Sequence, residues 1–290
     1  MPAGVARGTI AAMSREVTTR FAPGTIGPGR RAWAVALAML LAAATAGAAG
    51  SDASAPLRAC ASDVDFPPFV MTSSSGFPSG SQNTGLAVNV LQRALRRAGR
   101  EPAVVERLPW RRCRESVANG EFQIALDVPT RELDAKRYIA TAAYAEIHRV
   151  YIYSPRQFPA GPPLHALADL KRRQVCALAG SRLDADGIDA AHQDTGAHDE
   201  RGAILKVAAG RCEVFIEYRE VVDSLFAHDA GLQELFRTLG LRRMDLPNDA
   251  PTGLHFELGA AVLQGAALQQ SFNATIRYLI DKGEMARMTP

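Results

Sequence analysis

The sequence lacks the short motifs that mark several large enzyme classes. It contains no Walker loop and no glycine-rich Rossmann loop for binding phosphates. Ser181 lies outside the Gly-x-Ser-x-Gly context of a hydrolase nucleophile, and the sequence shows no base for it. Internal repeats and coiled-coil heptads are also absent. The sequence therefore gives no support for a nucleotide-binding enzyme, a serine hydrolase or a repeat protein.

Ordered metal ligands are absent as well, since none of the four cysteines has the spacing of a zinc site. In the polar segment 184–201, five candidate ligands crowd together without tetrahedral spacing, namely His192, Asp194, His198, Asp199 and Glu200. We predict no metal and no cofactor. We expect this segment to be a solvated excursion on the surface.

Residues 1–48 differ from the rest of the chain. Arginines precede an apolar run at residues 32–44, and Ala46-Gly47-Ala48 follows that run directly. This order is typical of a secretory signal peptide, and we expect cleavage after Ala48, with Met13 as an alternative start. An uncleaved anchor is the alternative, although the run is short and alanine-rich for a transmembrane span.

The positive charge of the chain lies mainly in this leader. Residues 1–48 carry five arginines and one glutamate, so their removal changes the formal net charge from +3 to −1. A nearly neutral domain has no electrostatic footprint for nucleic acid or an anionic membrane surface. About 240 residues remain, enough for one large or two small domains. We expect a monomer that binds no nucleic acid.

Strand and helix patterns alternate along the remaining chain. In the first half, the pattern predicts strands at residues 57–61 and 122–128. It also predicts an amphipathic helix at residues 86–98 and a second helix after Trp110. The second half predicts strands at 174–179 and 213–218, a helix at 202–209, a return strand at 255–262 and a last helix at 268–280. Such alternation builds β-α-β units, whose small-molecule sites form at the carboxyl ends of the strands.

The ordered motifs resemble the family 3 extracellular solute-binding proteins, the periplasmic receptors of polar amino acid uptake systems. Asp65-Phe66-Pro67-Pro68-Phe69 is similar to the family's Asp-Tyr-Pro-Pro-Phe, and Gly85-Leu86-Ala87-Val88-Asn89-Val90 is similar to its Gly-Phe-Asp-Val-Asp-Leu. Gly120-Glu121-Phe122-Gln123, Ala168-Asp169-Leu170-Lys171 and Gly210-Arg211-Cys212-Glu213 resemble three further segments. The resemblance covers most of the chain after the leader.

The resemblance implies an α/β, two-lobed, periplasmic-binding-protein-like fold of type II, with two small, mostly parallel sheets joined by two crossing strands. It places residues 49–152 and 252–290 in lobe 1, and residues 153–251 in lobe 2. The solute binds between the lobes, which close about a hinge. The resemblance also implies a periplasmic location and the permease of an ABC-type uptake system as a partner.

All four cysteines lie in the part that we expect to be exported, where disulfides are the usual state. Four cysteines allow three pairings. Two of them come early and two late, on either side of the expected crossing, so we favour Cys60 with Cys113 and Cys176 with Cys212. Free buried thiols are the alternative.

The family's binding positions indicate a candidate site. Phe66 and Trp110 occupy the positions of its aromatic wall, although either ring could belong to the core. Asp127 stands where the family usually has a serine or threonine, and Thr130 follows it. A carboxylate there favours a cationic ligand group. Gly180 and Ser181 end the corresponding strand of lobe 2, where free backbone N–H groups would suit a ligand carboxylate; an ordinary turn is the alternative.

Two departures from the family argue against a standard amino acid ligand. The family's carboxylate-binding arginine in its Thr-Pro-Glu-Arg motif corresponds to Asp134, with Arg131 as a possible substitute three residues earlier. The acid that binds the ligand ammonium corresponds to Tyr218, with Glu217 directly before it. We therefore expect common L-α-amino acids to bind weakly.

Three functions follow from this resemblance. We favour a secreted receptor that is not an enzyme. A cyclohexadienyl dehydratase-like enzyme on the same fold is the second, with Asp127, Asp134 and Glu217 as candidate acid-base groups. An accessory or sensor protein without a transport ligand is the third.

Overall fold

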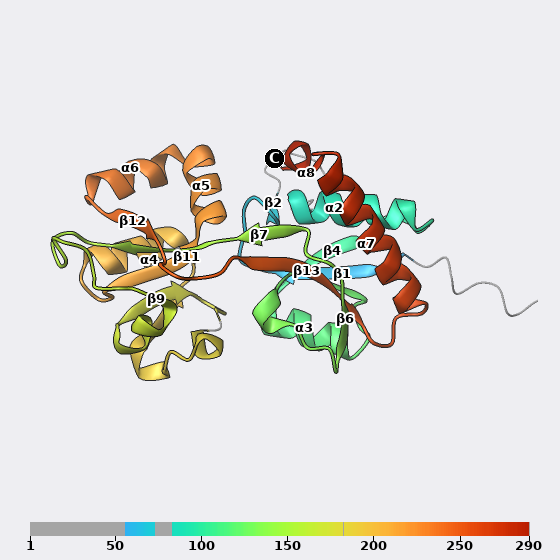
Figure 1. Ribbon diagram of the computed structural model, residues 1–290, viewed down its shortest axis with the longest axis horizontal. Helices are drawn as coiled ribbons and strands as arrows, with labels where there is room; N and C mark the ends of the chain where they lie inside the picture. Colours follow the sequence, from blue (N-terminus) through green and yellow to red (C-terminus); the bar gives the residue numbers. More distant parts are fainter. Residues whose placement is uncertain (1–55, 73–82, 182, 290) are drawn as a thin grey trace, which may run out of the picture. The chain divides into compact units, whose positions relative to one another are not determined.

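Two β-sheets carry the fold, one in each of two lobes (Figure 1). The computed structural model describes residues 56–72, 83–181 and 183–289, which belong to one unit of the chain, residues 54–290. The predicted signal peptide and its cleavage site lie outside these residues. Within the described part, no helix has the length and apolar character needed to cross a membrane.

Lobe 1 is built on a six-stranded sheet in the order β4-β1-β5-β13-β6, with β7 also paired to β13. The strands are β1 (Arg58–Ser62), β4 (Val104–Leu108), β5 (Ile124–Pro129), β6 (Tyr138–Ala140), β7 (Ala145–Ile147) and β13 (Thr252–Gly259). Strand β1 is parallel to β4 and β5, whereas β13 is antiparallel to each of its neighbours. A short ladder pairs β2 (Met71–Thr72) with β3 (Asn83–Thr84).

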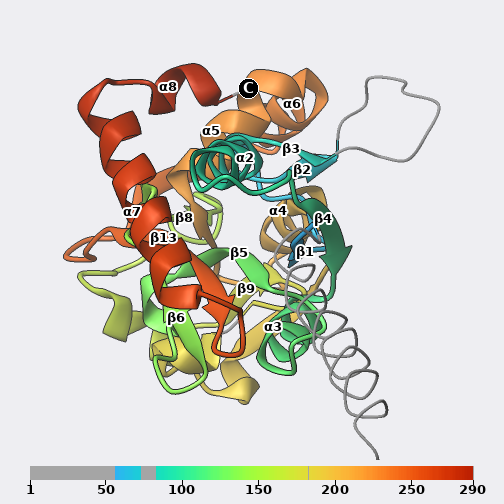
Figure 2. The ribbon, with the colours of Figure 1, turned by 90° about the vertical axis from the view of Figure 1, so that its right-hand side faces the viewer.

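Helices cover both faces of this sheet. Figures 1 and 2 show α2 (Leu86–Arg97) and α7 (Gly265–Asp281) on one side and α3 (Trp110–Ala118) on the other, with the short α8 (Met285–Met288) after α7. Successive residues of a strand point to opposite faces of the sheet, so they pack into the cores on its two sides. Ala59 and Leu126 pack with α2 and α7, and Cys60 and Ala125 pack with α3.

Lobe 2 contains a five-stranded sheet in the order β10-β9-β11-β8-β12. Its strands are β8 (Arg149–Tyr153), β9 (Val175–Leu178), β10 (Gln193–Ala197), β11 (Val214–Tyr218) and β12 (Arg242–Asp245). Side chains of α4 (Glu200–Ala208), α5 (Arg219–His228) and α6 (Ala230–Thr238) form one core. The 3-10 helices η2 (Leu167–Arg172) and η3 (Leu183–Asp186) contribute to the other. Two more, η1 (Thr130–Glu132) and η4 (Ala190–His192), lie in loops.

The predicted α/β, two-lobed architecture is confirmed, and two chain segments cross between the lobes (Figure 1). Both sheets are mixed in direction, because the strands next to the crossings pair antiparallel with their neighbours. The chain leaves the first sheet at Ile147 and joins the second at Arg149. The change of lobe therefore comes before the predicted boundary at residues 152/153.

One prediction about lobe 2 was wrong. Residues 184–201 are not a plain surface excursion, because they include η4 and the edge strand β10. Strand β10 is short, polar and only partly buried, and its register against β9 is irregular between Asp194 and Ala197. An edge strand needs few apolar residues, since only one of its sides is paired.

The start of α2 requires glycine. Gly85 has φ of 127°, and a Cβ there would collide with the backbone carbonyl of Phe69. This close approach lets the first N–H groups of α2 bond to the loop before it: Leu86 N donates to Pro68 O at 2.9 Å, and Ala87 N donates to Phe69 O at 3.0 Å. The first two backbone N–H groups of α2 therefore find their hydrogen-bond acceptors in the loop that carries Phe66.

The four cysteines form the two favoured disulfides. Cys60 of β1 pairs with Cys113 of α3, and Cys176 of β9 pairs with Cys212, just before β11. The Cα atoms are 5.7 Å and 5.6 Å apart, within the normal range. Each bond therefore lies within one lobe and joins elements of its core.

We expect each disulfide to stabilise its own lobe. The paired cysteines are 53 and 36 residues apart, and cross-links over such loops contribute about 3 to 4 kcal/mol through the unfolded state. The double variants C60A/C113A and C176A/C212A should each lose about this free energy of unfolding in a denaturant titration. Recovery of a native peptide that links Cys60 to Cys176 or Cys212 would contradict the assignment.

Candidate functional site

A cavity of about 150 Å³ lies between the lobes, at the carboxyl ends of β1, β5, β9 and β11. Eight of the nine predicted ligand-binding residues line it: Phe66, Trp110, Asp127, Arg131, Gly180, Ser181, Glu217 and Tyr218. The structure thus brings together residues that are up to 152 positions apart in the sequence, from Phe66 to Tyr218.

Thr130 differs from the prediction, because it does not line the cavity. Its hydroxyl accepts a hydrogen bond from Gly253 N at 3.1 Å and lies 3.0 Å from His255 Nε2. These contacts tie η1 to β13. Thr130 is therefore committed to the lobe 1 scaffold.

The aromatic residues contact both lobes. The Phe66 ring lies 5.2 Å from the ring of the buried Phe69, which belongs to the core of lobe 1. It also meets the Tyr218 ring of lobe 2 edge to face at 6.0 Å. Aromatic pairs of this kind have a preferred relative orientation, in addition to the contact area that the rings bury.

Trp110 is held by a chain of charged groups. Its indole Nε1 donates to Glu132 Oε2 at 2.8 Å. Arg114 Nη1 lies 3.6 Å from the same oxygen, and Arg114 Nη2 forms an ion pair of 2.7 Å with the fully buried Glu257. Burial raises the pKa of Glu257 to about 7, although Arg114 opposes the shift. The indole plane is therefore fixed before any solute binds.

Asp127 reaches the cavity through a bulge. On β5 the two residues between Ala125 and Val128 stand opposite a single residue of β13, and Asp127 has φ of 58°. A bulge re-aims a side chain, and aspartate tolerates this backbone region better than most residues. Strand β5 runs to Pro129, one residue past the predicted end at residue 128.

The chemical state of Asp127 is unusual. Burial raises the pKa of its carboxyl to about 7, against the opposing effects of a hydrogen bond from Tyr144 and the charge of Arg107. The Tyr144 hydroxyl donates to Asp127 Oδ1, and its buried ring stacks on Phe256 at 4.6 Å. Near neutral pH this carboxyl can therefore gain or lose a proton.

Glu217 faces the same cavity from lobe 2. Its side chain is buried, and Oε1 accepts a hydrogen bond of 2.8 Å from Tyr218 N. Burial and the nearby Glu200 raise the pKa of Glu217 to about 8, and Arg131 opposes this shift. Glu217 is mostly protonated at neutral pH as long as the cavity contains no cation.

Arg131 extends from η1 across the cleft to lobe 2. Its Nη1 donates to the Tyr218 hydroxyl at 2.7 Å, and its Nε lies 3.8 Å from Asp186 Oδ1. Asp186 pairs more closely with Arg149, at 3.0 Å. Arg131 therefore links the lobes in this structure.

Two of the other candidates for carboxylate binding, Asp134 and Ser181 N, are remote or occupied. Asp134 does not line the cavity, because its N–H donates to Glu257 and its own carboxylate accepts from Lys136 N. Ser181 N donates to Leu178 O at 3.1 Å, so this N–H is not free as we had expected. Gly180 lies in the turn with φ of 88°.

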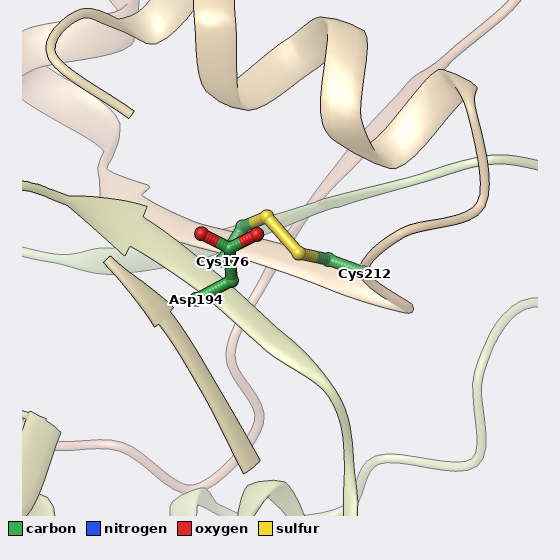
Figure 3. Close-up of side chains that lie close together, drawn as sticks. All are labelled: Cys176, Asp194 and Cys212. Atoms are coloured by element: carbon green, nitrogen blue, oxygen red, sulfur yellow. A yellow bond between two sulfur atoms is a disulfide. The ribbon is translucent and has the colours of Figure 1, made fainter. Parts of the chain in front are cut away.

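The polar residues of 184–201 do not form one site. Asp194 lies beside the Cys176–Cys212 disulfide, with one oxygen and both sulfur atoms within 4.8 Å of one another (Figure 3). Both sulfurs are bonded in the disulfide and cannot act as thiolates. Asp194 instead pairs with Lys206 at 2.5 Å. By contrast, His198, Asp199 and Glu200 line a second hollow next to the cavity.

Some residues of the site escaped prediction. Glu132 and Tyr144 orient Trp110 and Asp127, but each is an ordinary loop or core residue in the sequence. Glu200 was recognised only as part of a polar segment. A signal was present at Glu132, because the resemblance already placed the segment 131–134 beside the binding site.

Comparisons with known proteins place the fold. No protein-family profile matches the sequence, and no curated protein matches it. A histidine kinase sensor domain with similarity to periplasmic binding proteins matches with a TM-score of 0.61 and 14% identity, over 82% of this chain and 95% of that chain. The chain has the two-lobed fold of periplasmic binding proteins.

Two other solved structures match over a similar length. One is an amino acid ABC transporter substrate-binding protein from Streptococcus pneumoniae bound to L-arginine (TM-score 0.58, 15% identity, 81% of this chain and 92% of that chain). The other is an ancestral amino acid-binding protein, a precursor of cyclohexadienyl dehydratase (TM-score 0.55, 13% identity, 80% and 93%). Because a receptor, a sensor and a precursor of an enzyme all match, the fold alone does not determine the function.

The raised pKa of Glu217 predicts how stability depends on pH. The unfolded chain loses this proton near the ordinary value of 4.5, whereas the folded protein keeps it up to about 8. The free energy of unfolding should therefore fall as pH rises through this window. We expect Glu217→Gln to match the wild type near pH 4 and to exceed it by on the order of 2 kcal/mol near pH 9.

Denaturant titrations of the solute-free protein across this pH range measure the effect. The exposed Glu146 of β7 provides the control, and Glu146→Gln should show no pH-dependent gain. A difference between Glu217→Gln and the wild type that stays constant with pH would contradict the raised pKa.

Proposed function

We propose that the protein is an exported solute-binding protein that captures a small organic cation between its lobes for an ABC-type uptake system. One observation carries this proposal. Asp127 and Glu217, from opposite lobes, are desolvated in one cavity, and neither has an ion-pair partner within the described residues. A cationic group between them would favour both ionised forms and draw the lobes together.

The surroundings favour an amine without an α-carboxylate. Few donors are placed for a ligand carboxylate: Arg131 Nη1 already donates to Tyr218, its Nε lies 3.8 Å from the carboxylate of Asp186, and Ser181 N is already bonded. Asp134, at the family's clamp position, lies outside the cavity. The rings of Phe66 and Trp110 provide apolar walls for the rest of the solute.

A receptor role agrees with several of the similar structures. The substrate-binding protein from Streptococcus pneumoniae holds L-arginine, which carries a cationic side chain. Two disulfides agree with an oxidising compartment. A periplasmic location, a cleaved signal peptide and a permease partner are parts of the same proposal. N-terminal sequencing of the exported protein tests the cleavage after Ala48, and permease genes beside the coding sequence would favour transport over sensing.

A matched pair of probes tests the ligand class. Phenethylamine and L-phenylalanine differ only by the α-carboxylate, and we expect the amine to bind at least about ten-fold more tightly in calorimetry. Its affinity should rise between about pH 6 and pH 8.5, because the carboxyls with pKa values of about 7 and about 8 ionise there. Asp127→Asn should weaken the amine about ten-fold and reduce this pH dependence.

The control for these titrations is Asp189→Asn, which removes an exposed charge of lobe 2 outside both hollows. Mass spectrometry of solute released from natively purified protein identifies the natural ligand. A standard amino acid that binds below about 10 μM would contradict the proposal. Arg131 would then be the substitute clamp, and Arg131→Ala should abolish that binding.

A second candidate function rests on the same two carboxyls. Groups with pKa values of about 7 and about 8 on opposite walls of a cavity have the protonation states that general acid-base catalysis needs. Incubation with prephenate-like cyclic acids, followed by NMR, distinguishes the two. Turnover that is lost in Asp127→Asn or Glu217→Gln would establish an enzyme and contradict the receptor.

A further inference from the structure

A larger hollow adjoins the cavity and shares its wall. This outer chamber has a volume of about 670 Å³. Ser62, Val64, Asp65, Trp110, Ala179 and Gly180 line both spaces. The inner cavity and the outer chamber are therefore neighbouring parts of one cleft, and Trp110 belongs to the wall that they share.

The outer chamber is acidic. Its lining within the described residues contains Asp63, Asp65, Asp199 and Glu200 and no lysine or arginine. Two of these charges are already used: Asp65 pairs with Arg107 at 2.9 Å, and Asp199 Oδ1 accepts from Gly202 N at the start of α4. Asp63 is exposed, and no other described residue pairs with its side chain.

Glu200 is the unusual member. An acid in the first turn of a helix is ordinarily exposed and favoured by the helix dipole. The side chain of Glu200 is instead buried, with 9% of the residue exposed, and receives no hydrogen bond or ion pair from any other described residue. Burial, with the nearby Asp199 and Asp65, raises the pKa of Glu200. Within the described residues, the carboxyl of Glu200 is bonded only by its own backbone N–H. A buried acid that faces a hollow in this state is suited to a cation from outside.

The charges form a continuous path. Glu200 is close enough to Glu217 to raise the pKa of the latter, so the outer chamber and the inner cavity interact electrostatically. The acids of the outer chamber come from both lobes, Asp63 from lobe 1 and Glu200 from lobe 2. A cation between them would add a second bridge across the cleft.

The spacing of these acids argues against a metal ion. Within the described part of the chain, three ligand atoms come within 4.8 Å of one another only at Cys176, Asp194 and Cys212. The acids of the outer chamber are therefore too far apart to enclose one ion. A compact cation needs convergent oxygens, whereas an organic ammonium can pair with one carboxylate at a time.

We propose that the binding site extends from the inner cavity into the outer chamber and accepts an elongated organic dication. The first cationic group binds at Asp127 and Glu217, the flat part lies against Trp110, and the second cationic group binds at Glu200 and Asp63. This inference rests on the proposed function and names the solute class more narrowly.

Two sets of probes test it by calorimetry near pH 8.5, below the pKa of about 10.4 for a lysine-like amine. Phenethylamine carries one cation, and a series of phenethylamines with a para-aminoalkyl arm of increasing length carries two. We expect the best diamine to bind about ten-fold more tightly than phenethylamine. Glu200→Gln should remove most of this gain while weakening phenethylamine less than about three-fold, since it acts there only through Glu217.

Asp63→Asn is a second variant. Asp63 is exposed, so the loss of its charge leaves the core intact. This variant should also reduce the gain in affinity of the diamine over phenethylamine. Asp189→Asn should leave the gain unchanged. Equal affinities for the diamines and phenethylamine would overturn the inference but leave the proposed function standing, as would a gain that Glu200→Gln does not reduce.

If neither kind of amine binds, the proposed function fails and the inference fails with it. A calcium titration tests the alternative that the outer chamber binds a metal ion. Calcium binding that disappears in Glu200→Gln would assign the outer chamber to a metal ion and would overturn the organic dication.

Discussion

Removing a carboxyl group from water is costly unless a cation or several hydrogen-bond donors replace the solvent. The cleft contains two such groups that are compensated only in part, Asp127 and Glu217. Neighbouring acids are treated differently, because Arg107 pairs with Asp65 and Arg114 pairs with Glu257. Arg107 and Arg114 thus serve the scaffold, and the two cavity carboxyls have no ion-pair partner within the described residues.

The positions of the site residues could be predicted because they follow from the topology. Side chains at the carboxyl ends of parallel strands meet at one edge of a sheet, and the sequence marks those ends by apolar runs. The family resemblance indicated Trp110 and Glu217, and the structure places both at such an edge, one beside each sheet. The disulfides followed for the same reason, since two early and two late cysteines belong to different lobes.

Other features depend on contacts that no local pattern records. The bulge that aims Asp127 arises from the pairing of β5 with β13, whose residues are more than a hundred positions apart. Thr130 was predicted to bind the ligand, but its hydroxyl accepts a hydrogen bond from the backbone N–H of Gly253. The edge strand β10 escaped because a polar strand has the composition of a loop. Glu200 resembles an ordinary acid at a helix start, and only its burial sets it apart.

The contact of Arg131 with Tyr218 and Asp186 has a consequence for selectivity. It joins lobe 1 directly to lobe 2, so an opening of the lobes about the hinge has to break this contact. The same contact narrows the way in. For the proposed solute, the rate of entry, and not only the strength of the final contacts, then depends on how readily this contact opens.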